Sequence, residues 1–143
     1  MASPNTGDIL SMRLGDIKDI PPIPVGTYAA TITSIPKIDN FGQAQKPGVE
    51  FSFKLTAPQD DVDAEALAEA GGLPEAPLTY TFWRTSKAAG IFRSFLVDVL
   101  GFSEDEKPQD ALMQVQGMEA LVTIEHNTWK GRTSSRIRGF AKA

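Results

Sequence analysis

Alternation of apolar and polar positions is the strongest pattern in the chain. The run 49–55 has Val, Phe, Phe and Leu at every second position, with Glu, Ser and Lys between them. A period of two places the apolar side chains on one face of a β-strand. Three other runs are rich in strand-forming residues: 27–35, 78–84 and 120–125. The last continues through a turn at 127–132 into a basic strand, so the pattern predicts five strands, with a loop at 36–48.

A helical pattern separates the third predicted strand from the fourth. Apolar residues recur at helical spacing from Ala88 to Leu100, Ser86 is a suitable N-cap, and Gly101 supplies a stop. A second helical turn is predicted at 109–116. Five strands with one main helix between the third and fourth are typical of the OB-fold, a partly open barrel. We therefore predict an all-β, five-stranded OB-fold-like barrel rather than a β-sandwich or jelly roll, which would show more strands and no single strong helix.

Two segments stand apart from this pattern. Residues 1–24 lack periodicity and end in prolines, so we expect an N-terminal arm followed by one domain at 25–143. The segment 57–77 interrupts the strands and has no sustained apolar stripe, so we expect a surface insertion with a short helix within 60–70. Between 60 and 75 it carries no Lys or Arg and six carboxylates, those of Asp60, Asp61, Asp63, Glu65, Glu69 and Glu75.

Composition narrows the function classes. The 143 residues suit one globular domain, and the absence of cysteine excludes disulfides and thiolate chemistry and favours a cytoplasmic protein. No signal peptide and no membrane-spanning run is expected. The only histidine, His126, has no neighbouring catalytic or metal-binding motif, and the cluster 60–63 lacks the glycine and terminal glutamate of a calcium loop. We therefore expect no enzyme, no metal and no cofactor.

The distribution of cations and aromatic rings points instead to a polyanion. From Trp129 to the C-terminus there are five basic residues and no carboxylate, although the net charge is -4. A second group, Trp83, Arg84 and Lys87, follows the third predicted strand. Aromatic rings beside cations hold unpaired bases above a phosphate backbone. The predicted nucleic-acid-binding residues are Phe41, Lys54, Tyr80, Trp83, Arg84, Lys87, Trp129, Lys130, Arg132, Arg136 and Arg138.

Several runs together resemble a known family. They are Pro-Pro-Ile-Pro-Val-Gly-Thr-Tyr at 21–28, Gly-Val-Glu-Phe-Ser-Phe-Lys-Leu at 48–55, Phe-Trp-Arg-Thr-Ser at 82–86 and Val-Thr-Ile-Glu-His at 122–126. The chain resembles the replication-associated single-stranded DNA-binding proteins of tailed bacteriophages. The resemblance implies an OB-fold and binding of single-stranded DNA without sequence preference, during phage replication or recombination in the host cytoplasm. Several such proteins end in an acidic tail that recruits replication proteins, whereas this chain ends in a basic segment, which leaves the acidic segment 60–75 for such recruitment.

Other interpretations of the same residues stay open. A basic last strand also protects an exposed sheet edge from aggregation. Trp83 suits a core position as well as a stacking platform, and Tyr80 suits the core or the barrel rim better than a contact. Trp129, in a polar turn, is better explained by base stacking. The alternative function is a protein-interaction or virion-structural module in which Trp129 anchors a protein, and RNA is a further possible ligand.

Overall fold

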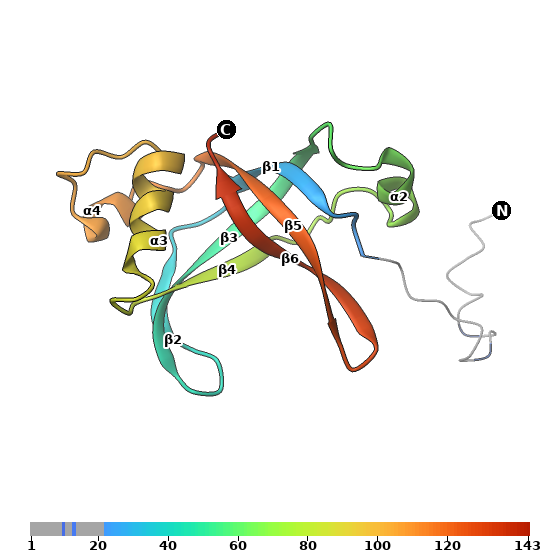
Figure 1. Ribbon diagram of the computed structural model, residues 1–143, viewed down its shortest axis with the longest axis horizontal. Helices are drawn as coiled ribbons and strands as arrows, with labels where there is room; N and C mark the ends of the chain where they lie inside the picture. The colour runs from blue at the N-terminus through green and yellow to red at the C-terminus, as the bar shows by residue number, and fades with distance from the viewer. Residues whose placement is uncertain (1–9, 11–12, 14–21) are drawn as a thin grey trace.

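The computed structural model describes residues 10, 13 and 22–143, except for the side chains of Trp129 and Arg132. Most of the predicted arm, 1–24, therefore lies outside the described residues. The described part is mostly β-sheet with short helical segments (Figure 1). Its elements are β1 (Gly26–Ile32), β2 (Lys37–Phe41), β3 (Lys46–Pro58), α2 (Ala64–Glu69), β4 (Leu78–Trp83), α3 (Ala89–Ser94), the π-helical turn η2 (Phe95–Val99), α4 (Pro108–Leu112), β5 (Glu119–Trp129) and β6 (Arg132–Ala141).

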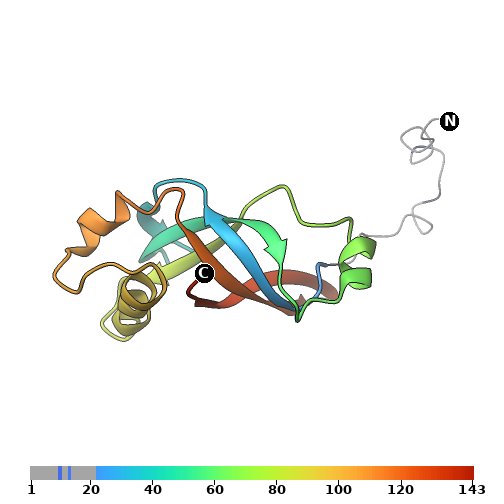
Figure 2. The ribbon, with the colours of Figure 1, turned by 90° about the horizontal axis from the view of Figure 1, so that it is seen from above.

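The six strands form one antiparallel sheet organised around β3. One edge of β3 pairs with β2 along its first half and with β1 along its second half, while the other edge pairs with β4. β1 also pairs with β5, and β5 pairs with β6. Among the described residues no ladder joins β4 to β6, so the hydrogen-bonded sheet is not closed. The helical segments α3 and α4 lie at one end of the sheet and α2 at the other (Figure 1 and Figure 2).

An aromatic cluster fills the space inside the curved sheet. The alternation predicted for the second strand is confirmed, because the four apolar side chains of β3 are all buried. Phe95, from η2, lies 5.2 Å from the ring of Phe51 and 4.6 Å from that of Phe140 in β6. Phe140 in turn contacts Tyr80 of β4, at 5.0 Å between ring centroids. Side-chain packing thus brings β4 and β6 together where backbone pairing is missing.

Strand boundaries differ from the prediction in the first third of the chain. The segment 36–48 was predicted to be a loop, but it contains β2 and the start of β3, so the sheet has six strands rather than five. The first strand ends at Ile32 instead of residue 35. β2 is exposed along nearly its whole length, so its sequence has no need for an apolar face. Its strand conformation depends on hydrogen bonding to the longer β3, which is a tertiary effect.

The helical and hairpin predictions also need correction. Ser86 is not the N-cap of the main helix; the helix begins at Ala89, and Thr85 Oγ1 accepts a hydrogen bond from the N–H of Ala88 at 3.2 Å. The predicted single helix is α3 followed by a π-helical turn, and the second helix is Pro108–Leu112 rather than 109–116. The last hairpin turn is only two residues long, Lys130 and Gly131, with φ of 51° and 79°. Those positive φ values are typical of tight hairpin turns.

The end of the predicted arm packs onto the sheet. Ile23 is buried in the core, and its carbonyl accepts a hydrogen bond from Nε2 of His126 at 2.7 Å. The buried hydroxyl of Tyr28 donates to the carbonyl of Pro24, also at 2.7 Å. The only histidine therefore has a structural partner, and residues 23–24 belong to the folded domain.

The acidic insertion is attached to the sheet more firmly than we expected. The carboxylate of Asp61 accepts hydrogen bonds from the backbone N–H and the hydroxyl of Thr27, both at 2.9 Å. These bonds, the backbone one first, lower the pKa of Asp61. Asp63 caps α2 by accepting from the N–H groups of residues 65 and 66. The expectation of a segment without an apolar face is wrong, since four side chains pack against the core: Val62, Leu67, Ala70 and Leu73.

None of the helices in the described part of the chain has the length and apolar character needed to cross a membrane.

Candidate nucleic-acid interface

Phe41 and Trp83 come together on the outer face of the sheet. The backbone register places Gly48 of β3 opposite Trp83 of β4 on one side and beside the β2 strand on the other. A methyl group added to Gly48 would lie 3.1 Å from Cδ2 of Phe41, 3.2 Å from Cε3 of Trp83 and 2.7 Å from Cγ2 of Thr81. Only glycine lets the two rings approach the strand this closely. We call Phe41 and Trp83, with Gly48 between them, the aromatic platform.

The platform is partly open to solvent, with Trp83 exposed and Phe41 half-buried, and has cations around it. Trp83 is 36% exposed, and it alternates with the buried Phe82, so its ring faces away from the core. Arg84 follows directly, and its backbone N–H donates to the carbonyl of Pro47 at 2.9 Å. Lys46 is the strand partner of Phe41, and the ammonium of Lys37 lies 6.0 Å from the Phe41 ring centroid. The question of whether Trp83 is core or surface is thus answered: it is a surface residue.

The charge on this face is mixed, with free cations near the rings. Asp39 and Glu50 share the outer face of β2 and β3 with the platform. Among the described residues, however, Lys37, Lys46 and Arg84 form no ion pair with a carboxylate. Cations without a partner keep their full charge for an anionic ligand, whereas paired ones must first be released.

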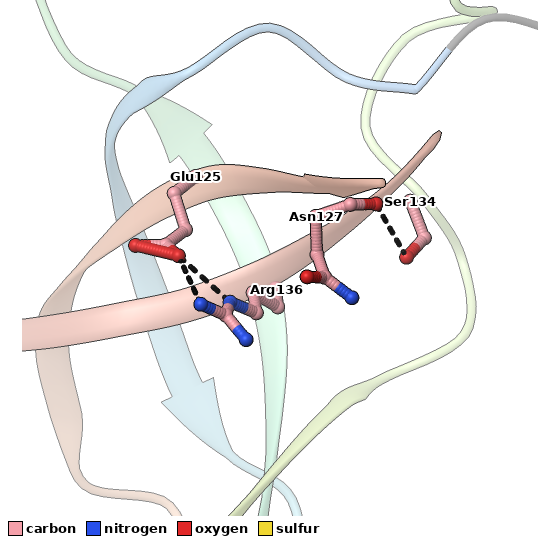
Figure 3. A network of polar contacts seen from close by, with 4 residues as sticks. All are labelled: Glu125, Asn127, Ser134 and Arg136. Atoms are coloured by element: carbon pink, nitrogen blue, oxygen red, sulfur yellow. Dashed lines mark hydrogen bonds and ion pairs between the residues drawn. The ribbon is translucent and has the colours of Figure 1, made fainter. Parts of the chain in front are cut away.

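The basic last strand carries its charge differently from what we predicted. Arg136 faces Glu125 across the β5–β6 pair, and its Nε and Nη2 lie 2.7 Å and 2.6 Å from the same carboxylate oxygen (Figure 3). Beside this pair, the Ser134 hydroxyl lies 3.5 Å from the carbonyl oxygen of Asn127. The charge of Arg136 is therefore largely balanced within the hairpin. This carboxylate is eleven residues away in the sequence and was overlooked.

The tip of the β5–β6 hairpin holds three of the predicted contacts. Trp129 and Arg132 are the last paired residues of the two strands, but their side chains lie outside the described part of the structure. Lys130 is exposed in the turn between them. In Figure 1 the tip of this hairpin and the tip of the β2–β3 hairpin both point toward the bottom of the view. The stacking role of Trp129 stays a prediction.

The remaining predicted contacts lie in two other places. Lys54 is exposed on the outer face of β3, opposite Thr31, and lies six positions along the strand from Gly48, or about 20 Å. Tyr80 points inward, with its ring 4.8 Å from that of Phe82. Together with Lys87 and Arg138, Tyr80 lines a groove of about 600 Å³ between β4, β6 and the helical segments α3 and η2. The predicted residues therefore do not form one cluster, and the core interpretation fits Tyr80 better than the stacking one.

Two features of the site were missed from the sequence. Gly48 was assigned to a loop, although its role is to let two rings approach β3. Lys37 and Lys46 were not selected, because β2 was not recognised as a strand. An alternation of Lys37, Asp39 and Phe41 is visible at these positions, and it would have placed them on one face.

No family model matches the chain, and no curated protein matches it in sequence. Among the described residues no group of three or more His, Asp or Glu side chains is placed to hold a metal ion. The interpretation of the site therefore depends on its own geometry, which consists of one exposed and one half-buried ring, nearby cations and an open sheet face.

Proposed function

We propose that this protein binds single-stranded DNA without sequence preference, with bases stacked on the aromatic platform and phosphates near the cations beside it. The observation that carries the proposal is the pairing of the half-buried Phe41 with the exposed Trp83, whose rings flank Gly48 on an open sheet face. Tryptophan is enriched at binding interfaces, where its ring supplies apolar contact area. Stacking on a flat ring accepts any base, because every base has a π-face, so the expected binding is independent of sequence.

We also propose that the sheet is an OB-fold-like barrel. Leaving out β2, the pairings of β1 with β3 and β5, of β3 with β4, and of β5 with β6 suit such a barrel, with the main helix between the third and fourth of these strands. OB-folds bind oligonucleotides on the face of their second and third strands, between two flanking loops. Here that face corresponds to β3 and β4, which carry Gly48 and Trp83. Action in phage replication or recombination is the setting that the family resemblance suggests.

A titration with labelled oligonucleotides tests this function. Fluorescence anisotropy is measured with oligo-dT, a duplex of equal length and oligo-U, each at two salt concentrations. We expect tight binding to oligo-dT, weaker binding to the duplex, and a loss of affinity with salt whose logarithmic slope is roughly 0.7 for each phosphate contact. Equal affinity for duplex and single strand would contradict the proposal. No binding to any of the three would favour the protein-interaction alternative, in which the platform anchors a protein.

A further inference from the structure

Five of the grooves on the described surface differ in the charge of their walls. The groove between α3 and α4 is lined by Arg93, Glu104 and Glu106, and the groove beside the acidic insertion by Glu75. The groove between β4, β6 and the helical segments α3 and η2 is lined by Lys87, Arg138 and Asp98. The other two grooves share Arg84, and neither is lined by a carboxylate. The walls of these two grooves therefore combine positive charge with no carboxylate, whereas each of the other three includes at least one carboxylate.

The two grooves without carboxylates adjoin one another. The smaller, of about 320 Å³, begins at Trp83 and runs along the segment that leads into α3. The larger, of about 540 Å³, reaches β2 at Ile38 and α4 at Lys107 and Gln109. They share three lining residues, Val49, Arg84 and Phe92. Together they form one channel, the Arg84 groove, which leads from the aromatic platform to the start of α4.

The walls of the Arg84 groove suit a nucleotide. Its larger part has apolar walls from Phe92, Leu112 and Ile38, and the Ile38 side chain is 54% exposed. Arg84 and Lys107 supply positive charge, and neither forms an ion pair with a described residue. A site for single-stranded nucleic acid needs two components: apolar surface that contacts a base, and cations that contact phosphates.

We propose that the Arg84 groove is a second subsite for single-stranded DNA. A DNA strand that leaves the platform at Trp83 would pass Arg84 and reach Lys107 and Gln109. This inference depends on the proposed function and extends it, because Lys107, Gln109 and Ile38 belong to none of the predicted contacts. Arg84 joins the two subsites, since it follows Trp83 directly and lines both parts of the groove.

Removing the far cation tests the second subsite. The Lys107→Ala variant is titrated with oligo-dT of increasing length, from about 4 to about 16 nucleotides, the range of site sizes of single OB-folds. Lys107 is exposed and makes no side-chain cap bond to α4, so the fold is expected to survive the change. We expect unchanged affinity for the shortest oligonucleotides and, for the longer ones, weaker binding with a salt slope lower by roughly 0.7. The matched control is Lys142→Ala, an exposed lysine after β6 and outside the groove.

Each outcome assigns success or failure to one of the two proposals. If Lys107→Ala binds every length as the parent does, while Trp83→Ala weakens binding, the second subsite is wrong and the platform stands. The same conclusion follows if Lys107→Ala and Lys142→Ala lose affinity equally. A parent protein that binds no oligo-dT contradicts the proposed function itself. Binding of a Glu-rich peptide that Lys107→Ala abolishes, without any length effect on DNA, would assign the groove to an acidic protein segment.

Discussion

Replacing Trp83 with alanine separates binding from folding. Trp83 lies on the outer face of β4, and its nearest strand partner is Gly48. Base stacking on an aromatic ring is worth about 1–3 kcal/mol, so the Kd for oligo-dT should rise between about 5-fold and about 150-fold. The stability loss should be small, because cross-strand contacts on an exposed face contribute about 0.2–1 kcal/mol each. We expect the Trp83→Ala variant to fold almost as stably as the parent.

The adjacent residue provides the control. Phe82 is buried among five other aromatic rings, on the opposite face of the same strand. Phe82→Ala should lower the free energy of unfolding by about 3–5 kcal/mol. Urea denaturation followed by circular dichroism measures stability, and anisotropy of labelled oligo-dT measures affinity. The reasoning is refuted if Trp83→Ala is folded and binds as tightly as the parent, or if it loses as much stability as Phe82→Ala.

Three other predictions follow from the geometry of the remaining residues. Arg138→Ala should lower the salt slope of oligo-dT binding more than Arg136→Ala, since Arg136 is already ion-paired; equal slopes from anisotropy titrations would contradict this. The lowered pKa of Asp61 means that its bonds to Thr27 stabilise the fold above the usual Asp pKa, and that this stability is lost as the pH falls through the folded-state pKa. In urea denaturation the Asp61→Asn variant should therefore differ most from the parent near neutral pH and converge with it in acid; a pH-independent difference would refute the role. Trp129→Ala should weaken binding by roughly tenfold with little change in melting temperature, and strong destabilisation would show instead that the ring is packed.

The sequence was sufficient where a residue's position depended on local periodicity. The buried face of β3 and the burial of Phe95, Leu96 and Leu100 late in the helical run follow from periods of two and 3.6 residues, although Ile91 of the same predicted stripe is exposed. Alternation along β4 gives Trp83 and Phe82 opposite faces, but it left open whether Trp83 is a core or a surface residue. The strand β2 could not be found this way, because it is exposed and gains its pairing from β3. The prediction of Ser86 as the N-cap was also wrong. The hydroxyl that bonds to the backbone just before α3 is that of Thr85, which accepts from the N–H of Ala88.

The candidate site was predictable in its residue types but not in its grouping. Phe41 and Trp83 are 42 positions apart, and only the register of β2 and β4 on β3 brings them over the same glycine. The pairing of Arg136 with Glu125 depends in the same way on the register of β5 and β6. Strand pairing decides which residues are cross-strand neighbours. The sequence therefore identifies candidate cations, but it does not show which of them are ion-paired with a carboxylate.

Tryptophan fluorescence is the most direct test of the central claim that bases stack on the platform. The chain has two tryptophans, so Trp129→Phe leaves Trp83 as the single emitter. Titration of this variant with unlabelled oligo-dT, in parallel with anisotropy of the labelled form, reports contact at Trp83 and binding separately. The account predicts strong quenching of Trp83 emission that saturates together with the anisotropy signal. Binding by anisotropy with unchanged Trp83 emission would contradict it.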